Sequence, residues 1–228
     1  NIKNKVNKIK VEPKVIVSGN QHWHNQFQTH WIANKIEKNT TLVIADHGGS
    51  FPLVEKFFDF DENICDYKIT FFKPIHHKHN QLPPAKIAYE NFDSFKSKNS
   101  NKASFLSIIL DEATRWPIRA QFNVISGQQK IVYQELKNFY DNLDNEIKKQ
   151  LKIKPFPTNR GWNSKKIMED LFGKEKIFYE KNLESIFKYT KINVCTYPET
   201  TFSEAMVSGI PTILLYLNEM HELHKATD

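Results

Sequence analysis

The chain has 228 residues, of which 39% are hydrophobic, and a formal net charge of +6. This length predicts one large domain or two small ones, with enough apolar residues for a sizeable core. No run of 18 apolar residues occurs, which excludes a membrane-spanning helix of ordinary length. The first residue is Asn and the last helical pattern stops in mid-course, so we interpret the sequence as a fragment truncated at both ends.

The basic residues do not follow the pattern of a nucleic-acid-binding protein. Of the 32 basic residues only Arg115, Arg119 and Arg160 are Arg, and the Lys residues are spread along the chain among acids. Surfaces that bind RNA or DNA are usually clustered and richer in Arg. We therefore expect no nucleic-acid partner.

The chain contains two cysteines, Cys65 and Cys195, and both lie in apolar, strand-like runs. This predicts buried free thiols, because two cysteines imply neither a disulfide framework nor a zinc knuckle. Such thiols are typical of a protein of the cytoplasm, which is the location we expect.

The first part of the chain predicts a β-α-β unit. Lys14–Ser18 and Thr40–Ala45 are short β-rich runs, and the second is typical of a buried strand. Between them, His22–Lys38 carries aromatic and aliphatic residues at helical spacing. A span of about 30 residues is the expected size of such a unit.

The second strand leads into the turn with the most reactive side chains of the chain, Asp46-His47-Gly48-Gly49. A carboxylate and an imidazole stand at the end of a strand, and two glycines allow the backbone to approach a ligand closely. A helical pattern with Glu55 in its first turns follows, and the free N–H groups at its start can receive an anion. The structural alternative is a tight turn in which Asp46 caps this helix.

An acidic turn and a third strand, Tyr67–Phe72, precede three histidines within four residues, His76, His77 and His79. Neither a cysteine nor an acidic pair accompanies them, which is unlike a closed zinc site. A solvent-exposed loop, a metal site, and a cleft loop in which His79 meets a phosphate or carboxylate remain as alternatives. We predict substrate contact by His79 and no metal.

A Pro-Pro linker divides the chain after residue 84 into segments 1–84 and 85–228. The second segment begins with a buried strand, Ala103–Leu110, that ends in the polar turn Asp111–Pro117. Gln128–Leu151 then predicts one long helix with an aliphatic stripe.

The short strand Ile153–Phe156 leads into a further polar turn. There Arg160 offers a bidentate contact to phosphate or carboxylate, and Gly161 lets the backbone come close. A structural ion pair of Arg160 is the alternative. Ser164 is predicted to cap the helix that follows.

The end of the chain predicts another β-α-β unit. Ile192–Val194 is a strand, Tyr197–Thr201 a polar turn, and Thr212–Tyr216 an apolar run typical of a strand buried on both faces. Because the crossover is right-handed, the turn lies at the carboxyl end of a parallel strand, where open α/β sheets bind ligands. The fold class is therefore α/β, with two Rossmann-like domains that face a cleft, as in GT-B glycosyltransferases.

Three segments carry a resemblance to a known family. HWHNQFQTHWIANKIEKNTTLVIADHGGSF resembles the helix, strand and Gln-His-Gly-Gly turn of a leptospiral-type family of bacterial surface-carbohydrate transferases, which is similar to GT-B transferases that use CMP-Kdo. NRGWN and TYPETTFSEAMVSGIPTILL are similar to later segments of that family. The resemblance covers most of residues 20–80 and 150–226. Asp46 stands where the family has Gln, and Phe71-Phe72-Lys73 replaces its Trp-Gly-Trp.

The resemblance implies a glycosyltransferase that moves a sugar from a nucleotide-sugar donor, with CMP-linked sugars among the candidates, onto a surface polysaccharide or lipid-linked glycan. Peripheral association with the inner face of the membrane is expected. The enzyme is expected to need neither a cofactor nor a metal. A GT-B-fold nucleotide-sugar 2-epimerase or hydrolase and an inactive carbohydrate- or nucleotide-binding fragment are the alternatives. The expected catalytic residues are Asp46, His47 and Glu55. The expected substrate-binding residues are Gly48, Gly49, His79, Arg160, Gly161, Glu199, Thr200, Thr201 and Glu204.

Overall fold

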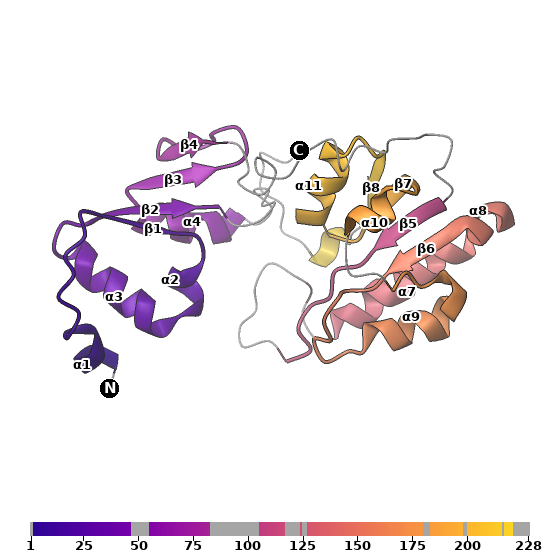
Figure 1. Cartoon of the computed structure of the whole chain (residues 1–228), viewed down its shortest axis with the longest axis horizontal. Helices are drawn as coiled ribbons and strands as arrows, with labels where there is room; N and C mark the ends of the chain where they lie inside the picture. The colour runs from indigo at the N-terminus through magenta and orange to yellow at the C-terminus, as the bar shows by residue number, and fades with distance from the viewer. Residues whose placement is uncertain are drawn as a thin grey trace. The chain divides into compact units, whose positions relative to one another are not determined.

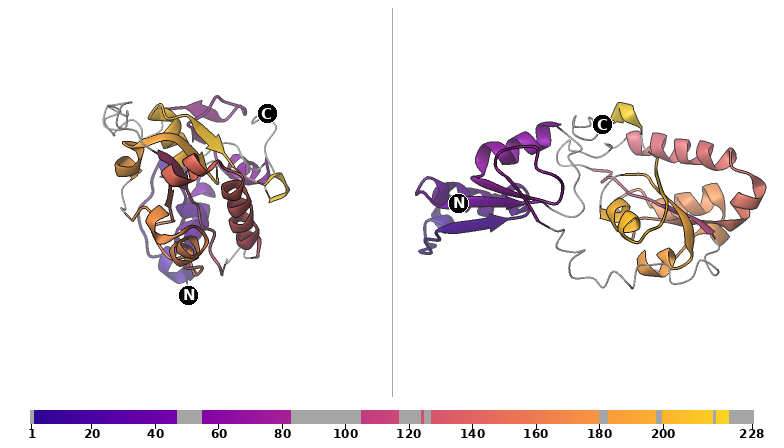
Figure 2. Two further views of the ribbon diagram at one scale, coloured as in Figure 1. Left: turned by 90° about the vertical axis from the view of Figure 1, so that its right-hand side faces the viewer. Right: turned by 90° about the horizontal axis from the view of Figure 1, so that it is seen from above.

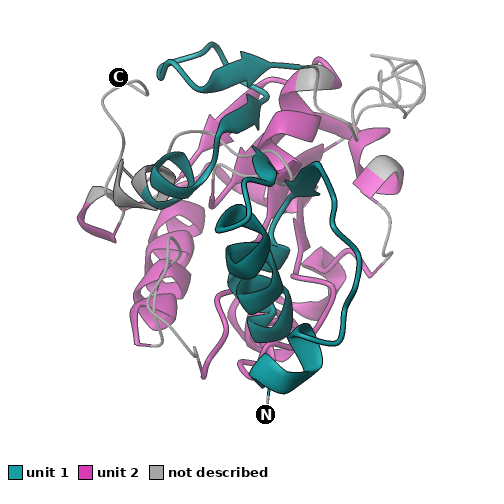
Figure 3. Ribbon diagram, turned by 90° about the vertical axis from the view of Figure 1, so that its left-hand side faces the viewer, with its two compact units in different colours: residues 1–84, 223–228 teal, residues 85–222 magenta. Residues whose placement is uncertain are grey.

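The structure is a computed structural model of the chain. It describes residues 2–46, 55–82, 105–116, 124, 127–179, 183–197, 200–215 and 217–220. The chain divides into two compact units, with residues 1–84 and 223–228 in unit 1 and residues 85–222 in unit 2 (Figure 3).

Unit 1 is built on a parallel four-stranded sheet in the order β1-β2-β3-β4 (Figure 1). The strands are β1 (Val15–Ser18), β2 (Thr41–Ala45), β3 (Tyr67–Thr70) and β4 (His79–Gln81). The helices are α1 (Ile2–Val6), α2 (Gln21–His24), α3 (Gln26–Ile36) and α4 (Glu55–Ile64).

Helices α3 and α4 cover one face of this sheet. With the strands they form an apolar core made of Ile16, Ile32, Leu42, Ile44 and Cys65, against which Ile64 of α4 packs. The even-numbered residues of β1 and β2 point into this core, because side chains alternate along a strand. Val15 and Val17 point to the opposite face and are more than half exposed.

Three sequence predictions for unit 1 were wrong in their details. The single helix expected over His22–Lys38 is two helices, because Asn25 is extended and its Oδ1 accepts the N–H groups that open α3. The acidic turn expected before the third strand is the last part of α4. The fourth strand, β4, which begins at the last residue of the histidine segment, was not predicted, because three residues are too few to show the alternation of apolar and polar side chains in a strand.

Unit 2 is a second parallel sheet, in the order β6-β5-β7-β8. The strands are β5 (Phe105–Ile109), β6 (Leu151–Lys154), β7 (Thr190–Cys195) and β8 (Thr212–Leu214). The helices are α7 (Gln128–Asp141), α8 (Asn145–Gln150), α9 (Ser164–Phe172), α10 (Leu183–Phe187) and α11 (Thr200–Val207), with 3₁₀ turns at Lys174–Lys176 and Asn218–Met220.

Helices pack on both faces of the second sheet (Figure 2). Ile108 of β5 faces the core formed with α7 and α9, while its neighbour Ile109 faces α10 and α11. Ile177 forms an isolated parallel bridge with Ile153 of β6. When the strands are numbered by their order along the chain, with β5 as 1 and the bridge at Ile177 as 3, their spatial order is 3-2-1-4-5. Rossmann-like sheets have this order of strands. All the strands are parallel, but the order in which the chain adds them changes side between β5 and β7.

The structure corrects the boundaries expected in unit 2. The long helix over Gln128–Leu151 ends at Asp141, and Leu151 already belongs to β6. Near Ile177 the chain pairs with β6 through a single bridge. β8 is an edge strand with Ile213 47% exposed, so the interpretation of Thr212–Tyr216 as buried on both faces was wrong. The two cysteines are buried free thiols, as predicted.

Ser164 is the first residue of α9 and not its cap. The cap is Asn163, whose φ of 55° lies in the left-handed region. In the part of the chain that the structure describes, no helix is both long and apolar enough to cross a membrane.

Candidate functional site

Buried polar side chains gather at the carboxyl edge of the sheet in unit 1. Ser18 ends β1, Asp46 directly follows β2, and Lys68 lies within β3. All three are in phase with the core positions Ile16 and Ile44, so they point toward the face that α3 and α4 cover. The sheet therefore places these groups under the helices and away from bulk water.

Lys68 is a fully buried cation between two carboxylates. Its side chain is 0% exposed, and its Nζ lies 3.9 Å from Asp46 Oδ1 and 3.8 Å from Asp61 Oδ2. The carboxylates are also buried, at 5% and 8% side-chain exposure. A buried ammonium group needs such partners, because its transfer from water costs several kcal/mol.

Asp61, on α4, also receives hydrogen bonds from α2. Its Oδ1 lies 2.9 Å from His22 Nε2 and accepts the indole N–H of Trp23 at 2.9 Å. On the other side of the imidazole ring, His22 Nδ1 lies 2.8 Å from Ser18 Oγ. The chain of contacts thus runs from Ser18 through His22 and Asp61 to Lys68 and Asp46.

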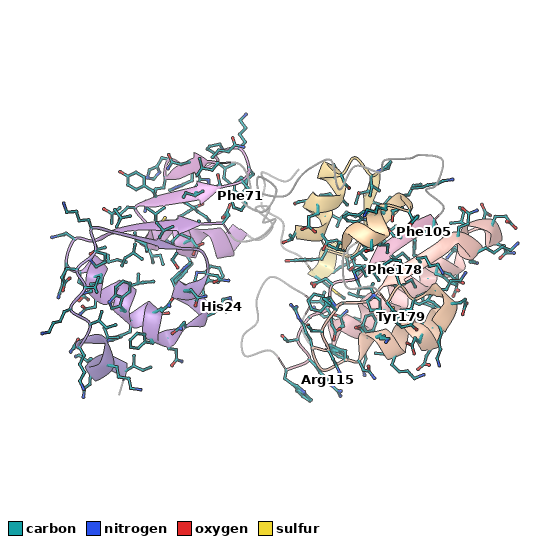
Figure 4. All side chains as sticks on the ribbon, viewed as in Figure 1. His24, Phe71, Phe105, Arg115, Phe178 and Tyr179 are labelled. Atoms are coloured by element: carbon teal, nitrogen blue, oxygen red, sulfur yellow. The ribbon has the colours of Figure 1, made fainter. Side chains whose placement is uncertain are left out.

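The surroundings of Asp46 suit proton transfer. Burial raises the pKa of its carboxyl from 3.8 to about 6, against the opposing effects of Lys68 and of a backbone hydrogen bond from Phe71, which is labelled in Figure 4. The nearby acids Asp61 and Glu62 raise the pKa further. Asp46 Oδ2 has no hydrogen-bond partner among the described residues. A carboxyl with a pKa close to neutrality can both accept and release a proton near pH 7.

Several residues predicted from the sequence for this side of the site cannot be placed. His47, Gly48 and Gly49 lie outside the described residues, and Glu55 is described only as the backbone start of α4. His79 is placed, and its ring is buried against α4 with Nε2 2.6 Å from Glu62 Oε1. Burial lowers the pKa of His79.

In unit 2 the corresponding site is the point where the strand order reverses. The loops after β5 and β7 meet there, because Asp111 N donates a hydrogen bond of 3.2 Å to Thr196 Oγ1. In open α/β sheets, ligands bind at this position beyond the carboxyl ends of the strands. The Asp111–Pro117 and Tyr197–Thr201 turns predicted from the sequence start from this edge.

Glu112 ties the loop after β5 to the loop after β6. Its side chain is fully buried and accepts hydrogen bonds from Arg160 N at 3.2 Å and from Ser164 Oγ at 2.5 Å. Its backbone oxygen accepts a third, from Arg160 Nη1 at 2.7 Å. Glu112 thereby fixes the start of the Arg160 turn.

Arg160 is exposed at the edge of the sheet and lies over the ring of Phe156, with its guanidinium carbon 4.0 Å from the ring centre. One of its donors serves Glu112, and a guanidinium has five. Arg115, labelled in Figure 4, adds a second cation to this turn, since its Nη1 donates to Gly161 O at 3.3 Å. Two guanidinium groups held beside one glycine turn are suited to an anionic ligand.

Gly161 itself is needed for this close contact. Its φ is +102°, and a Cβ at this position would lie 2.9 Å from Arg115 Cβ. A side chain would therefore be strained and would displace Arg115.

The turn after β7 places hydroxyls at the start of a helix. Thr200 and Thr201 are the first residues of α11 and are half-buried, and Glu204 is buried one turn later. Glu199 lies outside the described residues. The described residues Arg160, Gly161, Thr200, Thr201 and Glu204 all belong to loops or helices at the carboxyl edge of the second sheet.

Sequence reasoning missed four residues of these sites: His22, Asp61, Lys68 and Glu112. Lys68 gave a misleading signal, because alternation along the strand predicts that Tyr67 and Ile69 point inward, whereas Lys68 is the buried residue. Asp61 and His22 gave none, since each lies in a segment whose helical bounds were misplaced.

Comparison with known proteins identifies a family. A family model described as LIC12162 family transferase matches residues 1–228, the whole chain. Neither a curated protein nor a solved structure gives a significant match.

Proposed function

The chain belongs to the LIC12162 family of transferases, and from this we propose that it is a glycosyltransferase. On this proposal the sugar comes from a nucleotide-sugar donor, with CMP-sugars among those to test, and the acceptor is a surface polysaccharide or lipid-linked glycan. The reaction takes place in the cytoplasm at the inner face of the membrane. The two α/β units make up a GT-B-type enzyme, with the acceptor held by residues 1–84 and the donor by residues 85–228.

The observation that carries the proposal is the buried carboxyl of Asp46. It stands at the carboxyl end of a parallel strand, 3.9 Å from a buried ammonium group, with a pKa raised to about 6. Sugar transfer to a hydroxyl needs a group that takes up the proton of the attacking oxygen. At pH 7 the Asp46 carboxyl is largely ionised and basic enough for that role.

The reaction replaces the bond between the anomeric carbon and the phosphate oxygen by a bond to the acceptor oxygen. In an inverting reaction, Asp46 or His47 accepts the proton of the acceptor hydroxyl as the oxygen attacks the anomeric carbon. The bond from that carbon to the phosphate oxygen breaks, and the phosphate leaves with the electron pair. In a retaining reaction, the carboxylate would instead attack the sugar first, as glycosidase nucleophiles do. Glu55 is the weaker candidate for either role.

The donor side has the groups that a departing nucleotide phosphate requires. Arg160 keeps donors in addition to the one bound to Glu112, and the Gly161 backbone allows close approach. The hydroxyls of Thr200 and Thr201 and the N–H groups at the start of α11 add neutral donors. Glu204 and Glu199 would bind ribose or sugar hydroxyls, while Gly48, Gly49 and His79 would contact the substrate on the acceptor side. Stabilising charge on a leaving group in this way is a large part of enzymatic catalysis.

The test is a transfer assay on the full-length protein with CMP-, UDP- and GDP-sugars, each with and without glycan acceptors. We expect transfer that depends on an acceptor, a loss of about 10²–10⁴-fold in kcat for Asp46→Asn, and unchanged nucleotide binding in that variant. Arg160→Met should instead weaken donor binding, measured by calorimetric titration.

Two results would contradict the proposal. Full turnover by both Asp46→Asn and His47→Ala would remove the catalytic assignment. Conversion of the donor without any acceptor would indicate an epimerase or a hydrolase.

A further inference from the structure

We propose that Glu62, His76 and His79 form a binding site for a zinc ion. The residues come from three segments of unit 1: Glu62 from α4, His76 from the loop after β3, and His79 from the start of β4. One ligand atom from each lies within 4.8 Å of the other two. The inference does not need the proposed glycosyltransferase activity, and on it His79 binds the metal in place of the substrate contact proposed above.

The sheet explains why these residues meet. His79 pairs with Lys68 in the register of β3 and β4, so its side chain points to the face that α4 covers. There its Nε2 lies 2.6 Å from Glu62 Oε1, and the side chain of His79 is fully buried. The hydrogen bond from His79 N to His76 O, at 3.0 Å, closes a tight turn that returns His76 to the same place.

The ligand set is one that zinc accepts in proteins. Two imidazoles and one carboxylate form the protein ligands of several zinc enzymes, with the fourth position left for water. Glu62 and His76 are partly exposed, so water can reach the site. At tetrahedral angles, zinc–nitrogen and zinc–oxygen bonds of about 2.0–2.2 Å place ligand atoms roughly 3.3–3.5 Å apart. His79 Nε2 and Glu62 Oε1, now 2.6 Å apart, would therefore separate as the ion replaces the hydrogen bond between them.

The surroundings of the rings indicate which nitrogen would bind. Lys78 N approaches His76 Nδ1 at 3.3 Å, and Ile75 N approaches His79 Nδ1 at 3.4 Å. In both contacts Nδ1 accepts a backbone N–H, at a distance that is long for a hydrogen bond. Binding of zinc through Nε2 moves the ring proton to Nδ1, so each ring would have to turn away from that backbone donor. Nε2 of each ring is then the metal ligand, and in His79 it already faces the carboxylate.

Nearby cations moderate the affinity that we expect. The ammonium group of Lys78 is held by Glu62 O at 2.5 Å and Cys65 O at 2.7 Å, and Lys68 also acts electrostatically on His79. Both would repel a dication. The site is therefore expected to bind zinc reversibly and to join α4 to the loop before β4.

The experiment is a titration of the full-length, EDTA-treated protein with ZnCl₂ in competition with a chromophoric chelator. We expect one zinc ion per chain at this site and a Tm that rises by about 5 °C at a hundredfold excess over Kd. His76→Ala and Glu62→Gln should each weaken binding by about tenfold or more. His76 and Glu62 are chosen because neither is fully buried.

His77→Ala is the matched control. His77 is the neighbouring histidine, exposed and outside the cluster, with its ring 4.1 Å from that of His76. The control should bind zinc within about twofold of the native protein. The proposal is wrong if the native chain takes up no zinc, or if His77→Ala weakens binding as much as His76→Ala does while circular dichroism shows all variants folded.

Discussion

Lys68 Nζ lies 3.9 Å from Asp46 Oδ1 inside unit 1, where neither side chain is more than 5% exposed. At this distance the cation opposes the effect of burial on the pKa of the carboxyl, which still rises to about 6. The protonation of Asp46 therefore depends on a residue of the neighbouring strand. The first two predictions concern this pair.

Lys68→Met removes the cation and leaves the burial, so the pKa of Asp46 should rise further. Asp61 and Glu62, the acidic groups that face Asp46 from α4, act in the same direction. If Asp46 acts as the base, the acidic limb of the pH–rate profile shifts upward by about one unit or more. Lys38→Met, at an exposed residue, is the control and should leave the limb in place. A downward shift in a folded Lys68→Met protein would show that Asp46 is not the group observed.

Asp46→Asn should change how stability depends on pH. The pKa of Asp46 is raised in the folded protein, from 3.8 to about 6, so the folded state binds the proton more tightly than the unfolded state. The native protein therefore loses stability relative to the variant as pH rises from about 4 to about 6, by a total of about 3 kcal/mol. Urea denaturation of both proteins at several pH values measures this difference. A native protein that gains stability relative to the variant as pH rises from about 4 to about 6 would contradict the raised pKa.

The sequence predicted the sheets better than it predicted the sites. Strand periodicity and turn residues are local signals, and they located strands in both units, including those that end at Ala45 and Cys195. Helix bounds failed where a side chain rather than a glycine or proline stops the pattern, as Asn25 does. Asn25 acts through its hydrogen bonds to the next helix, which depend on a backbone conformation that the sequence does not reveal.

The buried polar contacts were beyond local reasoning for a different reason. His22 and Asp61 are 39 positions apart, and Glu112 and Arg160 are 48 apart. Their meeting depends on which strands are neighbours in the sheet, and on which face each helix covers. In β3 the local pattern even points the wrong way, because Tyr67 and Ile69 are its apolar residues whereas Lys68 is the buried one.

Glu112→Ala should destabilise unit 2 by about 3–5 kcal/mol. The change leaves Arg160 N and Ser164 Oγ without their acceptor, and each hydrogen bond to a charged group contributes about 1.5–3 kcal/mol. Glu112→Gln keeps one acceptor oxygen and should lose less. Chemical denaturation compares both variants with Glu146→Ala, at a well-exposed residue, for which we expect a change below about 1 kcal/mol. Equal effects of the first and last variants would show that Glu112 does not hold the loops together.

Gly161→Ala should weaken donor binding as well as stability. The backbone there has a φ of +102°, and the new methyl group would lie 2.9 Å from Arg115 Cβ, so the turn must shift. We expect a loss of about 1–3 kcal/mol in unfolding free energy and a rise in the Kd for nucleotide.

Gly127→Ala is the matched control for this change. Gly127 has a φ of −63° at the start of α7, with nothing within 4 Å of the added atom, so its replacement should be neutral or stabilising by up to about 1 kcal/mol. Calorimetric titration with CMP and UDP, together with thermal unfolding of each variant, separates the two effects. If Gly161→Ala bound nucleotide as tightly as Gly127→Ala, the Arg160 turn would not be the phosphate site.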